Sequence, residues 1–277
     1  MIQNSAVLVE LNISVWSARR YDRSVSEEVA QSKQASRKAG NYNKHLLAGS
    51  HELEEIMTNV AAIRQWHYKN TLPWSDSGAR ILPVMGFNTY MQKVSDFEQK
   101  FAGLVDVFLQ EYPRLILEAE RELGVMFDIN EYPTVEGVRR KFNFSVACSP
   151  LPVAGDFRID VGEQAMEALK STYERTTQAR VEGAMKDAWG RLHDCLSHIS
   201  NRLGGEKTIF RDSMVENALE LCSVLTSLNI TNDPQLEDMR KQVESMFLGV
   251  DPVDLRKDTA FRASVKTKVD SLLGMFV

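Results

Sequence analysis

Alternating apolar and polar residues predict strands in three segments of the chain. Over residues 6–15, one face of the strand is wholly apolar: Val7, Val9, Leu11, Ile13 and Val15. The same alternation covers 142–148 and, more briefly, 157–161, with Pro150, Pro152 and Gly155 between them. We therefore expect these two segments to form an antiparallel hairpin. Because an isolated hairpin is only marginally stable in water, residues 6–15 should supply the third strand of its sheet.

Apolar residues spaced three and four apart predict helices over most of the remaining chain. We expect helices at 50–71, 87–123 with a kink or break at Pro113, 134–141, 166–203, 209–228, 234–248 and 258–276. Gly124 is placed to end the second of these helices, and Gly204 with Gly205 to end the longest one. The predicted fold is α+β and predominantly helical, with long amphipathic helices and one small three-stranded antiparallel sheet.

The pattern also suggests how the chain is organised. Residues 1–165 hold a strand, an arm, a helical hairpin and a β-hairpin that should share one core, and the helices of 166–277 should pack on this part. A helix of about 40 residues is roughly 60 Å long, whereas a compact monomer of 277 residues has a diameter of about 50 Å. Projecting apolar surface is usually covered by another chain, so we expect self-association or a tight protein partner.

The stretch HYKNTLPWSDSGARILP at 67–83 separates two long amphipathic patterns. Leu72 precedes Pro73, which favours extended geometry and should stop the incoming helix near Thr71. The residues from Ser75 to Gly78 then supply the side chains and backbone freedom of a turn.

Two interpretations of this central stretch remain open. It can be an ordered connection of an αα-hairpin, pinned by Trp66 and Trp74. It can also be a recognition loop that presents Trp74, Asp76 and Arg80 to a partner, since binding residues often lie on loops held by rigid scaffolds. We expect both roles, divided among the residues, and Asp76 and Arg80 are close enough in sequence to pair.

One segment differs in net charge from the rest of the chain. The whole chain has a formal charge of −5 and 43% hydrophobic residues, which excludes wholesale disorder and a generally basic nucleic-acid coat. Residues 17–45 are instead polar, with seven basic and three acidic residues and thus a net charge of +4. Such a reversal can attract phosphate or an acidic protein surface, and the candidate residues are Arg19, Arg20, Arg23, Lys38 and Lys44. The alternative is a solvated, mobile arm.

The chain contains no motif that fixes a reaction. No GxxxxGK[ST], GxGxxG, HExxH or GxSxG string occurs, and the histidines lack the i, i+4 spacing of a helical metal pair. Three widely spaced cysteines favour reduced thiols, and we expect Cys148 and Cys195 to be buried. No apolar run approaches the roughly 20 residues of a membrane span. We predict a cytoplasmic protein with no enzymatic activity, cofactor, metal or membrane association.

Four segments stand out as a set: the N-terminal strand followed by W-x-x-x-R, AGNYNKHLL at 39–47, the central stretch at 67–83, and FNFSVACSPLPVAGDFRID at 142–160. This set resembles a family of bacteriophage and prophage proteins of unknown function. The resemblance covers about the first 165 residues. Genes of this family often lie near genes for MoxR-like AAA ATPases and for proteins with von Willebrand factor A-type domains. The resemblance therefore implies a non-enzymatic partner of an ATPase in the host cytoplasm, and it supplies no catalytic residues.

Two functional hypotheses follow. In the first, the chain is a phage accessory protein that acts as an interaction or adaptor module for a partner such as a ring ATPase. In the second, it is an accessory factor that binds DNA or RNA: the basic residues of the arm contact phosphates while Trp66, Tyr68 or Trp74 stacks on unpaired bases. The overall negative charge weighs against the second hypothesis.

Overall fold

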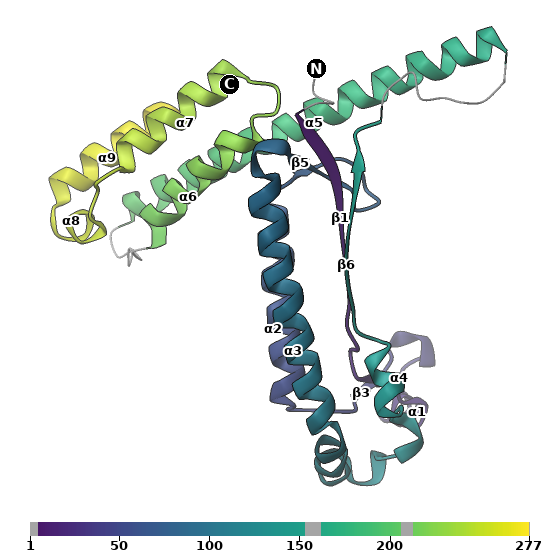
Figure 1. The fold of residues 1–277 in the computed structure, drawn as a ribbon. Coiled ribbons are helices and arrows are strands. Elements are labelled where there is room, and N and C mark those ends of the chain that lie inside the picture. Colours follow the sequence, from purple (N-terminus) through teal and green to yellow (C-terminus); the bar gives the residue numbers. More distant parts are fainter. Residues whose placement is uncertain (1–4, 153–161, 206–212, 277) are drawn as a thin grey trace. The chain divides into compact units, whose positions relative to one another are not determined.

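The computed structural model describes residues 5–152, 162–205 and 213–276, and the chain forms two compact units. Unit 1 contains Met1–Glu10, Trp66–Met91 and Ala147–Val277, and unit 2 contains Leu11–Gln65 and Gln92–Val146. The boundaries fall inside strands and long helices, so the chain passes between the units without linkers (Figure 1).

Within the described residues, the main sheet has four strands in the order β4-β5-β1-β6. They are β1 (Ala6–Ser14), β4 (Leu72–Pro73), β5 (Arg80–Pro83) and β6 (Asn143–Pro150). Strand β5 is antiparallel to both β1 and β4, with Val9 opposite Arg80 and Leu72 opposite Ile81. The mainly helical α+β class and the strands at 6–15 and 142–148 are confirmed.

The three-stranded sheet of the sequence prediction is wrong, because the central stretch adds β4 and β5 to it. Strands of two and four residues are too short to show an alternating pattern, so no period-two signal predicts them. The segment expected as a third strand, 157–161, lies outside the described residues.

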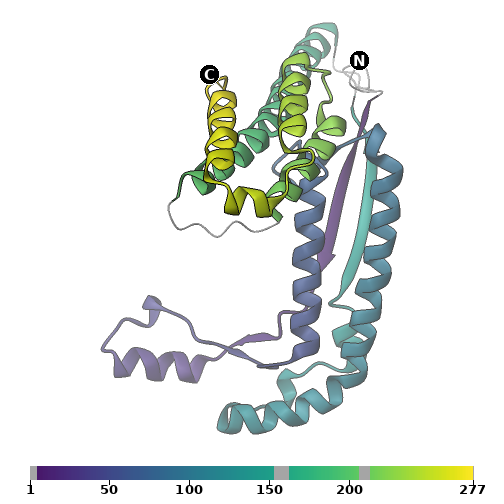
Figure 2. The same ribbon diagram turned by 90° about the vertical axis from the view of Figure 1, so that its left-hand side faces the viewer.

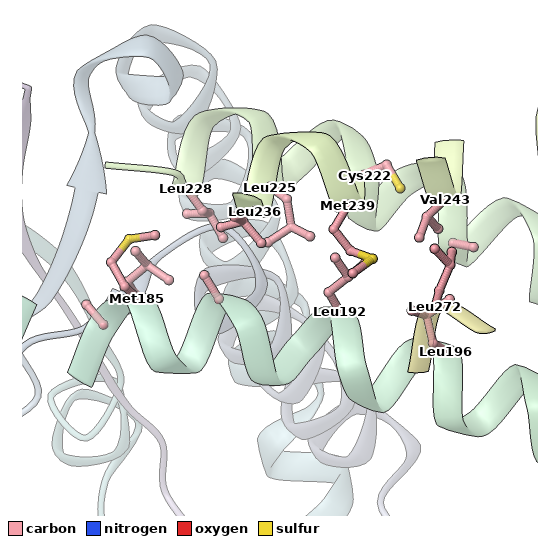
Figure 3. Close-up of a cluster of buried hydrophobic side chains, with 14 of the residues drawn as sticks. Met185, Leu192, Leu196, Cys222, Leu225, Leu228, Leu236, Met239, Val243 and Leu272 are labelled. Atoms are coloured by element: carbon pink, nitrogen blue, oxygen red, sulfur yellow. The ribbon is translucent and has the colours of Figure 1, made fainter. Parts of the chain in front are cut away.

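Unit 1 buries its core between five helices. They are α5 (Glu163–Gly204), α6 (Ser213–Leu228), α7 (Pro234–Phe247), α8 (Pro252–Lys257) and α9 (Thr259–Leu273). Figure 3 shows side chains of α5, α6 and α7 interdigitating, and Leu192, Leu225 and Val243 have no exposed surface. The long helix and the three helices expected after it are confirmed, with the short α8 as an addition.

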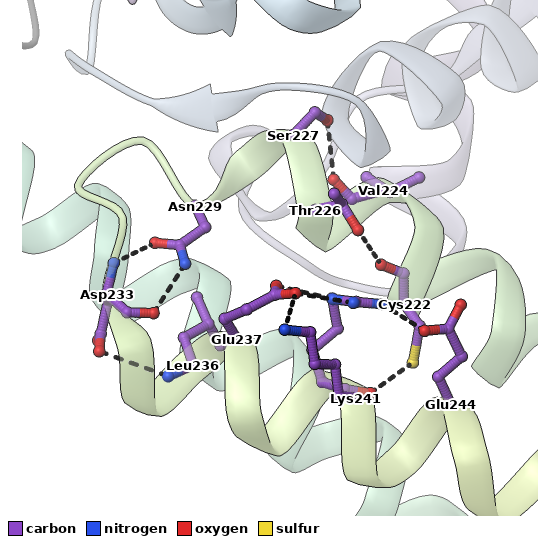
Figure 4. Close-up of polar contacts among 11 residues, drawn as sticks. Cys222, Val224, Thr226, Ser227, Asn229, Asp233, Leu236, Glu237, Lys241 and Glu244 are labelled. Atoms are coloured by element: carbon purple, nitrogen blue, oxygen red, sulfur yellow. Dashed lines mark hydrogen bonds and ion pairs between the residues drawn. The ribbon is translucent and has the colours of Figure 1, made fainter.

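Polar side chains fix the ends of these helices. Asn229 closes the α6–α7 connection, since its side chain accepts from the Asp233 backbone N–H and donates to the Asp233 carbonyl, both at 2.8 Å (Figure 4). The Asp233 carboxylate in turn caps α7 by accepting from the backbone N–H of Gln235 and Leu236. Further along, Arg240 donates to Glu237 and Glu244, and its guanidinium holds the pKa of Glu237 near 2.

Unit 2 is built on parts of two long helices, α2 (His51–Lys69) and α3 (Val84–Leu123), with α4 (Val135–Arg139) beside them. Its core is aromatic: Trp16 packs edge-on against Tyr112 at 5.8 Å between ring centroids, and Phe108 has no exposed surface. The buried Tyr132 hydroxyl donates to the carbonyl of Leu46 at 2.7 Å. Two short 3-10 helices, Gly124–Met126 and Ile129–Glu131, connect α3 to α4.

Pro113 lies inside α3 and does not break it, although a proline removes one backbone donor. The helix instead bends in its C-terminal part (Figure 2), and buried Tyr112 and Leu115 hold the chain on both sides of the proline. The sequence predicted a kink or a break at Pro113, and the structure has a bent helix without a break. Gly124, with φ of +52°, follows the last helical residue, as expected for a helix-ending glycine.

The cysteines differ from the prediction. Cys148 is exposed and Cys195 is half-buried, while Cys222 is buried. In β6, Phe144 and Val146 are only half-buried, and the strand is exposed from Ala147 onward. Cys148 follows the same alternation as Phe144 and Val146, but it lies in the exposed part of the strand.

We expect Leu192→Ala to lower the free energy of unfolding by about 2–5 kcal/mol, because it opens a cavity at a fully buried position. The control is Leu169→Ala on the same helix, where the side chain is 36% exposed and the change should be within about 0.5 kcal/mol. Urea denaturation measures both. Equal effects would show that the face of α5 is misassigned.

Candidate binding surface

The central stretch folds as part of the core of unit 1. Trp74 is only 6% exposed and belongs to the hydrophobic cluster of that unit. The turn is closed by the Ser75 N–H on the Ala79 carbonyl at 3.2 Å, and Gly78 adopts φ of +102°, a conformation that favours glycine. Asp76 is exposed at the tip and does not pair with Arg80.

Two arginines converge on the chain just beyond α2. Arg80 donates from Nε to the Thr71 hydroxyl at 2.6 Å and from Nη2 to the Thr71 carbonyl at 3.0 Å. Arg191 of α5 donates to the carbonyls of Tyr68, Lys69 and Thr71 at 2.8 to 3.0 Å. The carbonyls at a helix C-terminus lack partners within the helix and carry partial negative charge. A guanidinium therefore caps α2 both by hydrogen bonding and by charge.

Positive charge exceeds negative charge around Thr71. Arg80 and Arg191 face one nearby carboxylate, Asp187, whose Oδ2 lies 2.8 Å from Arg191 Nη2. Burial, followed by the neighbouring Arg191, lowers the pKa of Arg80, and the Arg80 guanidinium also lies 4.9 Å over the Tyr68 ring. Arg80 was a candidate from the sequence and Arg191 was not, because their contacts join segments far apart in the chain and leave no local signal.

The aromatic residues near Thr71 make contacts with one another inside the fold. His67 is 3% exposed, and its Nδ1 lies 2.6 Å from the Tyr90 hydroxyl. Burial lowers the pKa of His67 to about 4, with a further contribution from Arg80, while burial raises the pKa of Tyr90. The phenol therefore keeps its proton and can donate it to a neutral imidazole. Trp66 stacks on Tyr90 with 5.0 Å between ring centroids.

The arm at 17–45 is structured rather than a plain solvated tail. It contains β2 (Arg19–Tyr21), α1 (Arg23–Ser32), a 3-10 turn (Arg37–Ala39) and β3 (Asn43–His45). Strands β2 and β3 pair antiparallel, and Figure 2 shows α1 at the end of this ribbon, away from α2. Asp22 caps α1 by accepting from the Val25 N–H at 3.0 Å. An aspartate before a run of helix formers is a helix-start signal that could have been used.

Lys44 anchors the arm instead of offering its charge to a ligand. It is 5% exposed, and its Nζ donates to the Met126 carbonyl at 2.7 Å. The same nitrogen lies 2.7 Å from Glu131 and 3.6 Å from Asp22. With two carboxylates and a carbonyl around it, the ammonium is fully engaged within the fold.

An open cavity of about 280 Å³ lies between α1 and the returning segment of the arm. The exposed surface of its wall is mostly apolar, and the wall consists of Ser26, Val29, Ala30, Lys33, Ala35, Ser36, Ala39, Gly40, Asn41 and Tyr42. The buried Ser26 holds the wall together, because its hydroxyl donates to the Asp22 carbonyl and accepts from the Tyr42 N–H at 2.9 Å. None of these residues was a candidate site residue from the sequence. We call this feature the arm pocket.

The exposed cations of the arm either pair with a carboxylate or have no acidic partner. Glu27 pairs with Arg23 and with Arg37, each at 3.0 Å, and these contacts lower its pKa. Arg20 lies at 3.9 Å from Glu131. Arg19, Lys33 and Lys38 have no acidic partner within the ranges that the structure describes. The arm pocket thus has free positive charge at its edge, and Lys33 is part of its wall.

Other chemistry is sparse. The described ranges contain no group of three or more His, Cys, Asp or Glu side chains placed to hold a metal ion. In the same parts of the chain, none of the helices combines the length and apolar character needed to cross a bilayer.

No protein-family model matches the chain, and neither the curated proteins nor the solved structures include a match. No relative therefore assigns a role to any of these residues.

We expect Arg80→Ala to lower the free energy of unfolding by about 1–3 kcal/mol, because it removes charged hydrogen bonds to Thr71, which has no exposed surface. Asp76→Ala, in the same turn but exposed, should change it by no more than about 0.5 kcal/mol. Thermal and urea denaturation test both variants. If Arg80→Ala leaves the free energy of unfolding unchanged, Arg80 is not needed for the fold and is again a candidate ligand contact.

Stability should fall on acidification because of His67. Its folded-state pKa near 4 lies below the ordinary 6.5, so the unfolded chain binds the proton more readily between these values. The loss should be fully developed near pH 4 and reach on the order of 2–3 kcal/mol. His67→Asn, which keeps an acceptor for Tyr90 but does not titrate, should flatten this dependence. His51→Asn on the exposed face of α2 is the control, and an equal slope in both variants would contradict the assignment.

Proposed function

We propose that the protein is a non-catalytic interaction module that binds a partner protein through its arm. The arm pocket carries this proposal: it is a mostly apolar cavity of about 280 Å³ with unpaired cations beside it, on an arm whose backbone is held by β2, β3 and Lys44. Recognition surfaces often combine such a fixed scaffold with exposed apolar and charged side chains.

The thiols and the buried histidine support a role without catalysis. Burial raises the pKa of Cys195 to about 11 and that of Cys222 to about 12, so neither provides a thiolate near neutral pH. His67 is buried, neutral and hydrogen-bonded to Tyr90, which suits a core residue better than a proton-transfer group.

The candidate partner is a MoxR-like AAA ATPase, and the proposed setting is the cytoplasm of a host cell that carries phage or prophage genes. The support is the resemblance of the first 165 residues to phage proteins encoded near such ATPases. Self-association is a further proposal, supported by the first half of α5. There the apolar residues of the stripe, Met166, Leu169 and Tyr173, are half-buried or exposed.

Binding of DNA or RNA is the second candidate function, because Tyr21 is 42% exposed and follows Arg19 and Arg20 in β2. The central aromatics support it poorly, because Trp74 is buried, Tyr90 stacks on one face of Trp66 and Arg80 lies over one face of Tyr68. Single-strand binding surfaces need such faces open for stacking.

Charge reversal in the arm tests the proposal. Arg19→Glu/Lys38→Glu should weaken binding to a purified MoxR-like ATPase by about tenfold or more, since repulsion at an interface edge slows association. The control, Lys100→Glu/Arg121→Glu on α3, changes the net charge equally at exposed positions outside the arm. Biolayer interferometry with ATP present measures both. Equal binding of the two variants would refute arm-mediated docking, and arm-dependent binding of a single-stranded oligonucleotide alone would favour the second function.

A further inference from the structure

We propose that the arm pocket binds an acidic peptide segment of the partner by taking in one large apolar side chain of that segment. This inference rests on the proposed function and specifies the chemistry of the partner. It follows from the size of the cavity, the residues of its wall and the distribution of charge around it.

The size of the arm pocket suits a side chain rather than a whole ligand. Its volume of about 280 Å³ is just below the roughly 300–1,000 Å³ of typical small-molecule sites. The cavity is also open, as a site for an anchor residue on a longer chain must be, because Ala35, Ala39 and Tyr42 in its wall are exposed. Peptide grooves commonly bind through such single apolar anchors.

The wall leaves this space empty because its residues are small. Ala30, Ala35 and Ala39 contribute only methyl groups, and Gly40 contributes no side chain. Larger apolar residues at these positions would fill the cavity from within. The backbone around it is fixed, since the Ala35 N–H donates to the Ala30 carbonyl at 2.9 Å and the Tyr42 N–H donates to Ser26. The cavity is therefore a property of the folded arm and not of a loose loop.

Charge selects an acidic segment. The wall of the arm pocket includes Lys33 and no acidic residue, and Lys38 is exposed in the adjoining 3-10 turn. Neither lysine has an acidic partner in the described part of the chain, so each can pair with a carboxylate of the bound segment. A nucleic acid is less favoured, because binding of a phosphate backbone depends on neutralising charge and gains nothing from a mostly apolar cavity.

The test uses a short fluorescein-labelled peptide of glutamate and alanine with one central phenylalanine, and fluorescence anisotropy as the readout. Ala35→Leu fills the cavity at an exposed position and should weaken binding about tenfold or more, because burial of one large apolar side chain is worth that much. Replacing the peptide phenylalanine by serine should have the same effect. Lys33→Glu/Lys38→Glu should also weaken binding, whereas Lys100→Glu/Arg121→Glu should not.

Three results would overturn the inference. They are no measurable binding of the peptide, equal binding to the parent and to Ala35→Leu, and tighter arm-dependent binding of a labelled single-stranded oligonucleotide. Thermal denaturation of Ala35→Leu checks that the variant folds, and Ala35→Ser, which leaves the cavity open, should bind the peptide like the parent. If arm charge reversal weakens ATPase binding but the peptide does not bind, arm-mediated docking stands and only the anchor model fails.

Discussion

The last carbonyls of α2 lie at the edge of a hydrophobic core, and the structure of unit 1 depends on how they are satisfied. A buried backbone carbonyl without a donor costs free energy comparable to a lost hydrogen bond. From α5, Arg191 donates to the α2 carbonyls of Tyr68 and Lys69 and to the carbonyl of Thr71 just beyond the helix, and Arg80 binds Thr71 from β5. A guanidinium can do this because it presents several N–H donors in one rigid plane. The contacts bind α2, α5 and the small sheet together and leave the central stretch little freedom to meet a ligand.

The arm depends on polar contacts more than on burial of apolar side chains. It has few buried apolar side chains of its own, and its shape depends on polar contacts of Ser26, Lys44 and Asp22. Because these contacts fix the backbone, the apolar surface of the arm pocket does not need to collapse on itself. Folding determinants and candidate ligand contacts are thus carried by different side chains of one short segment, which allows the wall to change without loss of the fold.

Much of the fold could be predicted from the sequence because long periodic segments carry their own signal. The spacing over 166–203 was sufficient for α5, and alternation was sufficient for β1. The short strands of the central stretch could not be found, since they are defined by pairing with β1 rather than by a pattern. The sequence indicated the arm as a candidate site but did not indicate the arm pocket within it. Its cations were visible in the composition, but burial of Lys44 and the cavity depend on contacts between distant segments.

The interleaved order of the two units affects how the protein emerges during synthesis. Every residue of unit 2 has been translated once Val146 is made, whereas unit 1 needs residues from α5 onward. Leu72, Trp74 and Ile81 therefore leave the ribosome well before the helices that bury them. At roughly 5–20 residues per second, this interval is on the order of ten seconds. During that time these apolar residues lack the helices that bury them, although every residue of unit 2 has already been made.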